Sequence, residues 1–133
     1  MKGSSTKHAF SRKERLKSAK TIESLFGPAA RRVKAYPLQF IFRELENGHG
    51  NSPIQVSFSV PKRRFRKAVQ RNHYKRWMRE AYRMQQASLP LDKSGQSPQI
   101  ALMIMLAGPP PATFREMMKA MQKGLGRLGR EIE

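Results

Sequence analysis

The sequence predicts an α+β fold, a two-layer α/β sandwich whose helices lie on one face of a sheet. Three observations support this prediction. Residues 37–45 and 54–60 alternate apolar and polar side chains, as half-buried strands do. Residues 99–107 are apolar throughout, which is typical of a strand buried on both faces. Residues 67–86, which separate the last two of these runs, have an amphipathic pattern and would complete a split βαβ unit.

The chain begins with a basic segment that differs in composition from the rest. Residues 1–13 are rich in Ser, Thr and Lys, and we expect a flexible arm there. Residues 14–130 are expected to form a single domain, because 133 residues are too few to form two hydrophobic cores of ordinary size.

The first element of this domain is expected to be a short helix. Ile22, Leu25 and Phe26 have the i, i+3, i+4 spacing of one helix face, and a Gly-Pro pair directly after them would end the helix. The pattern leaves open a further short strand near residues 31–36. The expected order of elements is therefore α-β-β(-β)-α-β-α.

Two alternating runs flank a turn rich in Gly and Asn at residues 47–51, and together they predict an antiparallel hairpin. In the first run, the apolar face consists of Leu38, Phe40 and Phe42, and the other face of Gln39, Ile41 and Arg43. In the second run, the apolar face consists of Ile54, Val56, Phe58 and Val60, and the polar face of Gln55, Ser57 and Ser59. The more polar face of the hairpin therefore either meets water or holds a ligand.

The predicted helix at residues 67–86 separates apolar from cationic side chains. Its apolar side consists of Tyr74, Trp77, Met78, Ala81 and Met84. Its polar side consists of Arg71, Asn72, Lys75, Arg76, Arg79 and Arg83. One side can pack on a sheet while the other presents a row of cations. His73 lies at the boundary, either as a packed residue or as a further contact of the polar side.

Residues 87–98 have the composition of a loop, and the apolar strand that follows is stopped by one Gly and three Pro. Thr113 and Glu116 then have capping-box spacing and predict the start of a final helix. The face that this helix would bury consists of Phe114, Met117, Met118, Met121, Leu125 and Leu128.

The charge of the chain limits its partners. Lys and Arg number 27 against 9 Asp and Glu, for a formal net charge of +18. Ten of these cations lie in residues 61–83, where Glu80 is the single acid. Nucleic acid is therefore the leading partner, and an anionic membrane surface is the second. The absence of Cys excludes a disulfide scaffold, a thiolate metal site and a Cys nucleophile.

The sequence shows no motif typical of an independent catalyst. His8, His49 and His73 have no Ser or carboxylate at a spacing typical of a catalytic site. The HExxH motif, Gly-rich phosphate loops and paired carboxylates are also absent from the sequence. We therefore expect no catalytic residue and no metal site built from protein ligands alone. The row of cations on the long helix favours binding to RNA phosphates, because one Arg can donate two hydrogen bonds to a phosphate.

Two runs resemble a known family. VSFSVPKR at residues 56–63 and RKAVQRNHYKRWMRE at residues 66–80 are similar to the signature of the protein subunit of bacterial ribonuclease P, the RNR-motif family. The resemblance covers residues 14–128 in order. Two positions depart from the family pattern: the third residue of the Arg-Asn-Arg motif is His73 here, and Ile22 stands where many relatives have an aromatic residue.

The resemblance implies a ribonuclease P protein-like sandwich with a left-handed βαβ crossover, against the general right-handed preference. It implies binding to the catalytic ribonuclease P RNA and to the 5′ leader of precursor tRNA, and so assistance in endonucleolytic leader removal during tRNA maturation. The RNA subunit would hold most of the Mg²⁺, with none bound by protein ligands alone. The expected location is the bacterial cytoplasm, without membrane contact or an obligate protein partner.

The resemblance and the helix pattern together imply two groups of site residues. The RNA-binding group consists of Lys62, Arg63, Arg66, Lys67, Arg71, Asn72, His73, Lys75, Arg76, Arg79 and Arg83. The leader cleft, between the first helix and the open sheet face, consists of Ile22, Phe26, Gln39, Ile41, Ser57 and Ser59, bordered by Asn72, Lys75 and Arg79. Core packing is the alternative role for Ile22 and Phe26.

Two other classes of function fit the composition. The first is a structural RNA-binding protein of the ribosomal type, since basic sandwiches also serve there. The second is a DNA-binding regulator, but the sequence lacks the preceding helix and turn that would dock the basic helix on a duplex.

Overall fold

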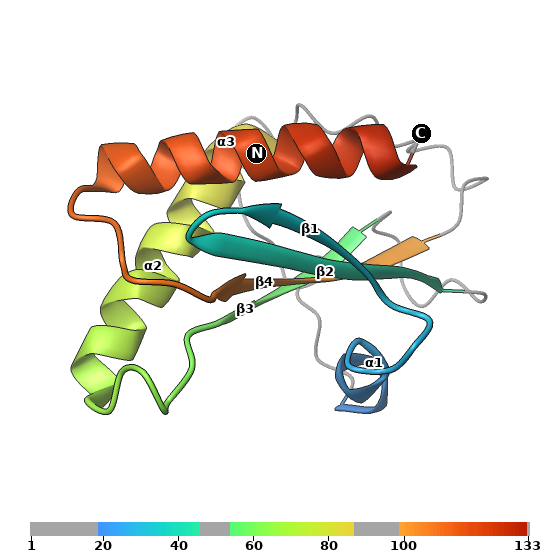
Figure 1. The fold of residues 1–133 in the computed structure, drawn as a ribbon, viewed down its shortest axis with the longest axis horizontal. Coiled ribbons are helices and arrows are strands. Elements are labelled where there is room, and N and C mark those ends of the chain that lie inside the picture. The colour runs from blue at the N-terminus through green and yellow to red at the C-terminus, as the bar shows by residue number, and fades with distance from the viewer. Residues whose placement is uncertain (1–18, 46–53, 87–98, 133) are drawn as a thin grey trace, which may run out of the picture.

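The computed structural model describes residues 19–45, 54–86 and 99–132 of the chain. Its elements are α1 (Ala19–Ser24), β1 (Arg31–Ala35), β2 (Leu38–Leu45), β3 (Ile54–Ser59), α2 (Ala68–Gln85), β4 (Gln99–Leu106) and α3 (Phe114–Ile132). They form a four-stranded sheet with packed helices (Figure 1). The predicted class and order are confirmed, with β1 as the further short strand. The predicted arm, the turn at residues 47–51 and the loop at residues 87–98 lie outside the described residues.

The order of strands in the sheet is β1-β2-β4-β3. β2 pairs antiparallel with both β1 and β4, while β3 pairs parallel with β4. The predicted hairpin between residues 37–45 and 54–60 is therefore wrong, because β4 lies between the two strands. β4 takes the central position because its side chains are apolar on both faces, and burial between two neighbours removes most of that surface from water.

The long helix connects two neighbouring parallel strands, β3 and β4. This arrangement is the predicted split βαβ unit. The left hand of its crossover stays a prediction.

The helices cover the two faces of the sheet unequally. α2 and α3 pack on one face, where they close the main core over strand residues such as Phe40 and Leu102. α1 lies on the opposite face, where Leu25 packs with Ile41 and Met103 in a much smaller cluster (Figure 1). The expectation that all helices lie on one face is therefore wrong for α1. Its apolar side docks on the second face because β2 and β4 both present apolar side chains there.

α3 lies in close contact with the sheet, and its first turn is fixed by an N-terminal cap. A Cβ atom on Gly124 would lie 2.0 Å from a ring carbon of Phe40, so this approach requires glycine. The predicted N-cap at Thr113 is confirmed, but the return bond of Glu116 goes to Ala112, one residue before the cap, rather than to Thr113 as in a complete capping box. The Glu116 N–H donates to Thr113 Oγ1 at 3.2 Å, and Glu116 Oε1 accepts a hydrogen bond from the Ala112 N–H at 2.9 Å.

The buried side of α2 is rotated from its predicted position. Met78 and Ala81 are buried as expected, but Met84 is 48% exposed and Tyr82 is fully buried. On the helical wheel, Tyr82 lies next to Arg71, at the start of the predicted polar side. The rotation therefore brings Arg71 to the edge of the core rather than to the outside of the helix.

Candidate nucleic-acid interface

The polar side of α2 presents its residues at two levels of exposure. The exposed residues are Asn72, His73, Arg76 and Arg79. The half-buried residues are Arg71, Lys75 and Arg83. Arg83 forms an ion pair with Glu80 at 2.5 Å. The hydrogen bond from Arg83 lowers the pKa of Glu80 below its usual value of 4.5 and raises the pKa of Arg83. Arg76 and Arg79 are therefore the most accessible arginines on this helix.

Arg71 ties the start of α2 to the loop that precedes it. Its Nη1 donates hydrogen bonds to the carbonyl oxygens of Phe65 at 2.7 Å and Arg66 at 2.9 Å. A guanidinium used in this way has fewer donors left for a phosphate. The structure therefore gives Arg71 a positioning role, and its predicted direct contact with RNA stays a prediction.

The loop of residues 61–67, which we call the basic loop, is fixed from inside. The N–H groups of Arg64 and Phe65 both donate to the Pro61 carbonyl oxygen, at 3.2 and 3.0 Å. The Phe65 ring is buried, with its centroid 5.5 Å from that of Tyr74. The cations that this frame leaves exposed are Lys62, Arg63, Arg64, Arg66 and Lys67. Arg64 was missing from the predicted group, although it belongs to the same basic run.

The face of the sheet that carries α1 is the predicted leader side, and strand register arranges its residues in rows. Gln39 is paired with Met105, which is paired with Ser59 on the far strand. In the next row, Ile41 is paired with Met103, and Met103 with Ser57. Gln39, Ser57 and Ser59 are all partly exposed, so the structure brings these three predicted cleft residues to one accessible face.

Ile41 differs from the other predicted cleft residues because it is fully buried. It packs in one cluster with Leu25, and Ile22 is partly buried against the same cluster. The prediction that Ile41 lines an accessible cleft is therefore wrong: it forms the floor on which α1 sits. Phe26, two residues after the end of α1, is 56% exposed and remains available to a ligand.

A hollow of about 620 Å³ joins the basic loop to the open part of this face. Ser59 and Met105 line it from the sheet, and Arg63 and Arg64 line it from the loop. We call this space the first hollow. It combines cations with an apolar sulfur-containing side chain and a hydroxyl, a combination suited to a flexible anionic strand.

His73 has an aromatic neighbourhood. Its ring centroid lies 4.7 Å from that of Trp77 and 4.9 Å from that of Tyr74. Trp77 in turn lies 6.0 Å from Phe114 of α3. His73 is thus both packed on Trp77 and exposed, and contact with RNA stays a prediction for this residue.

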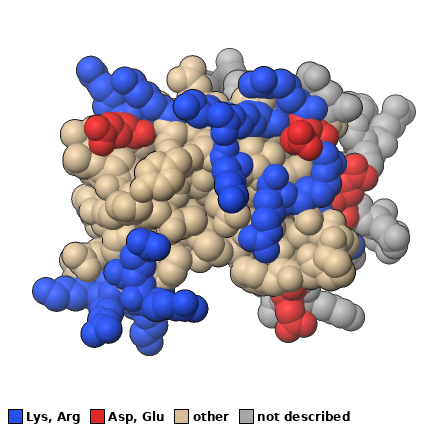
Figure 2. Space-filling view, in the orientation of Figure 1, with Lys and Arg blue, Asp and Glu red and all other residues tan. Residues whose placement is uncertain are grey.

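Lys and Arg side chains gather in two groups in Figure 2, one around the basic loop and the start of α2, the other along α3 and onto β1. Within residues 19–45, 54–86 and 99–132, no three His, Asp or Glu side chains come close enough to hold a metal ion. No helix of the described part is both long and apolar enough to cross a membrane.

Comparison with known proteins gives one consistent result. The profile of the family described as Ribonuclease P matches residues 10–129. Ribonuclease P protein components from two strains of Porphyromonas gingivalis are each 34% identical to this chain over 122 residues. These matches cover 92% of this chain and 88% of each relative.

Solved structures show the same fold. The ribonuclease P protein from Thermotoga maritima aligns with a TM-score of 0.58 and 23% identity, over 90% of this chain and 98% of its own. The protein from Staphylococcus aureus aligns with a TM-score of 0.59 and 17% identity, over 92% and 94% of the two chains. Since the family profile spans nearly the whole sequence and the curated relatives match along most of their length, this chain belongs to the family of ribonuclease P protein components.

Proposed function

We propose that this protein binds the catalytic RNA of ribonuclease P through the basic loop and the exposed side of α2, and that it binds the 5′ leader of precursor tRNA on the open sheet face. The main observation in support is the first hollow, where Arg63 and Arg64 meet Ser59 and Met105. Cations there can contact phosphates while the partly apolar floor accepts unpaired bases.

The internal bonding of the basic loop supports the same proposal. Arg71 and the buried Phe65 hold the loop in one shape before any RNA arrives. Cations on a preformed surface lose less conformational entropy on binding than cations on a free tail. The structure of the basic loop therefore supports its role as a preformed docking surface for folded RNA rather than as a solvated basic segment.

We propose that the RNA subunit performs the hydrolysis and holds most of the Mg²⁺. Phosphate oxygens and water suit this role, because Mg²⁺ in phosphate-binding sites keeps several waters and is held mainly by phosphates. The polypeptide instead contributes affinity for the leader and neutralises phosphate charge. Neutralisation lets two polyanions associate at a lower Mg²⁺ concentration. The partners are then this RNA and precursor tRNA, in the bacterial cytoplasm.

Reconstitution tests the proposal. Cleavage of precursor tRNA is measured with the protein alone, the catalytic RNA alone and both together, across a Mg²⁺ titration. We expect no cleavage by the protein alone, and cleavage by the complex at lower Mg²⁺ than by the RNA alone. Equal cleavage with and without protein at low Mg²⁺ would contradict the proposal and favour a purely structural RNA-binding role of the ribosomal type.

Crosslinking tests the placement of the leader. Photoreactive nucleotides in the leader of precursor tRNA are expected to attach to peptides containing Gln39, Ser57 or Ser59. Nucleotides in the mature tRNA serve as the control and are expected to leave these peptides unlabelled. Leader crosslinks that avoid the open sheet face altogether would contradict the assignment.

A further inference from the structure

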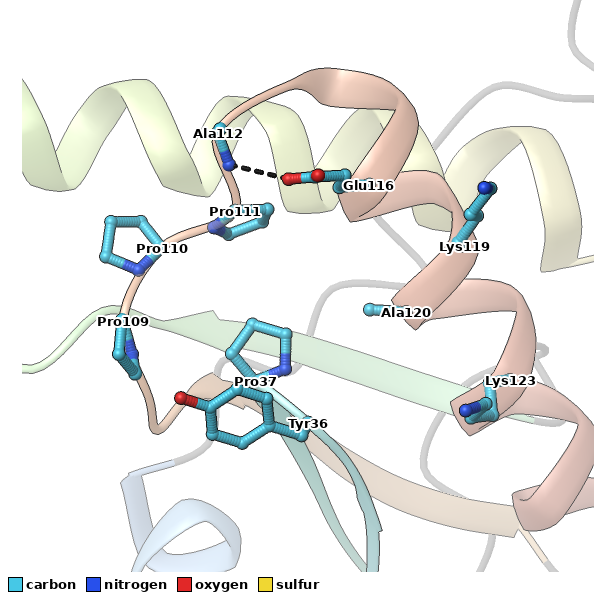
Figure 3. A pocket seen from close by; sticks show the side chains of 10 residues that line it. All are labelled: Tyr36, Pro37, Pro109, Pro110, Pro111, Ala112, Glu116, Lys119, Ala120 and Lys123. Atoms are coloured by element: carbon cyan, nitrogen blue, oxygen red, sulfur yellow. Dashed lines mark hydrogen bonds between the residues drawn. The ribbon is translucent and has the colours of Figure 1, made fainter.

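A second hollow, of about 500 Å³, lies at the end of the sheet on the side of α3. Figure 3 shows its three walls: Tyr36 and Pro37 from the turn between β1 and β2, the prolines that follow β4, and α3 with Lys119 and Lys123. None of these residues belongs to the predicted RNA-binding group or leader cleft. Their side chains therefore need a separate explanation.

Tyr36 is an exposed aromatic residue whose ring lies next to Gly108. The residue is 76% exposed, yet its ring lies so close to Gly108 that a Cβ there would lie 2.9 Å from Tyr36 Cε1. The N–H groups of Ala107 and Gly108 both donate to the Pro37 carbonyl oxygen, at 2.9 and 3.1 Å. The turn and the end of β4 are thus joined, and the Tyr36 ring presents an accessible surface beside Gly108.

The charges of the second hollow favour an anionic ligand. Lys119 and Lys123 are one helical turn apart, so they lie on the same side of α3. Both are exposed, and within the described residues neither takes part in an ion pair. Glu116, the acid of this hollow, uses Oε1 to accept the Ala112 N–H (Figure 3). Two cations and an exposed aromatic ring therefore line the same hollow.

The two hollows adjoin each other at the end of β4. Ala107 lines the first hollow, Pro109 lines the second, and Gly108 lies between them in contact with the Tyr36 ring. In Figure 2, the largely uncharged surface in this region lies between the basic group at the start of α2 and the basic group along α3. A strand leaving the first hollow at this end of the sheet would meet Tyr36 next.

We propose that the second hollow binds one further nucleotide of a single-stranded RNA that continues from the open sheet face. Its base stacks on Tyr36, and its phosphates contact Lys119 and Lys123. The inference rests on the proposed function, since it extends the path of the same strand. Stacking on an aromatic ring beside cations is how proteins bind unpaired bases without reading their sequence. An acidic protein segment would use the cations but would gain nothing from the position of Tyr36 beside the first hollow.

The test uses the full-length protein and a nested series of unstructured, fluorescently labelled RNA oligonucleotides, with affinity measured by anisotropy. For the longest RNAs, Tyr36→Ala is expected to weaken binding about tenfold, which corresponds to the stacking of one base. Tyr36→Phe keeps the ring and is expected to bind like the wild type. For the shortest RNAs, which fill only the open face, all three proteins are expected to bind equally.

Single-charge variants test the phosphate contacts. Lys119→Gln and Lys123→Gln are each expected to weaken binding of the longest RNAs, by about threefold to tenfold, and to reduce the salt dependence. Arg115→Gln is the matched control, because Arg115 is an exposed cation of α3 that does not line the hollow. An equal effect of all three variants would overturn the proposal, since net charge alone would then explain the loss.

Further outcomes separate the proposal from its alternatives. Equal affinity of wild type and Tyr36→Ala for RNAs of every length overturns it, and so does an equal loss at every length. Binding of a poly-glutamate peptide that requires Tyr36 and Lys119, without a matching effect on RNA, overturns it in favour of a protein partner. Crosslinking of a 4-thiouridine in the longest RNA to Tyr36 of the wild type supports it, whatever the stability of the variants. Failure of the wild type to bind even the shortest RNA would instead contradict the proposed function.

Discussion

The two faces of the sheet are made by the same strands, yet they differ in how completely they are covered. On the face under α2 and α3, Phe40 and its neighbours are sealed from water. On the face under α1, one small cluster around Ile41 is buried, while Gln39 and Ser59 stay partly exposed. The first face therefore stabilises the fold, and the second is left available for a ligand.

A single step along β2 moves from one face to the other. Phe40 contacts α3 at Gly124, whereas Gln39 lies beside Met105 on the open face. Because successive side chains of a strand point to opposite faces, one residue can serve stability while its neighbour serves binding. Substitutions at neighbouring positions of this strand should therefore separate the two roles.

The largest effect is expected for Phe40→Ala. Removing a fully buried ring leaves a cavity beside Gly124, and we expect a loss of about 3–5 kcal/mol in the free energy of unfolding. Urea denaturation measures the loss, and Gln39→Ala is the control from the same strand, with an expected change within about 0.5 kcal/mol. Similar losses of unfolding free energy for both variants would contradict the conclusion that the face under α2 and α3 provides most of the stability.

Arg71→Ala tests the border between the open face and α2. We expect a loss of about 1–3 kcal/mol in RNA binding, with Arg76→Ala showing a loss of similar size. The two losses are expected to have different causes. Arg71 holds the basic loop in place, whereas Arg76 is exposed and would contact RNA directly. Hydrogen exchange of the Arg64 and Phe65 amides is therefore expected to accelerate in Arg71→Ala alone. Unchanged exchange in that variant would make Arg71 a direct RNA contact rather than a positioning residue.

A smaller effect is expected on the open face itself. Gln39→Ala and Ser59→Ala each remove polar groups from the same row, and each is expected to weaken leader binding by about 0.5–1.5 kcal/mol. Gln122→Ala is the matched control, since Gln122 is an exposed residue of α3 outside both hollows. Precursor tRNAs with and without a leader provide the measurement. A loss that persists without the leader would place these residues elsewhere in the complex.

The smallest effect concerns Glu80 and Arg83 on α2. The hydrogen bond from Arg83 lowers the pKa of Glu80 in the folded state, so the pair stabilises the fold above the ordinary carboxyl pKa of 4.5. The stabilisation by this ion pair is lost as the pH falls through the lowered pKa of Glu80 in the folded state. Both side chains are partly exposed, so Glu80→Gln is expected to cost less than about 0.5 kcal/mol at neutral pH. Unfolding of the two proteins, compared at neutral pH and well below pH 4.5, should show the difference vanish on acidification.

The placement of the candidate site residues could be predicted from the sequence only in part. The exposure of Arg76 and Arg79 follows from helical periodicity. The choice of Lys62, Arg63, Arg66 and Lys67 in the basic loop also needed the resemblance to the family, and Arg64 was not predicted. Three features were missed because they depend on neighbours distant in the chain. Ile41 is covered by α1, Arg71 binds loop carbonyl oxygens, and Tyr36 meets Gly108 across the end of the sheet.

The sequence by itself determined most elements of this protein, the alternating faces of β2 and β3 and the location of its charge, because hydrophobic period, capping residues and charge clusters are local properties of the chain. Only the tertiary structure decided that β4 separates β2 from β3, that α1 docks on the second face, and that two hollows meet beside Gly108. These features arise because segments far apart in the chain pair with and bury one another. The alternation of apolar and polar residues within one strand shows which face is buried. It does not specify which neighbouring strand or helix removes the most apolar surface from water.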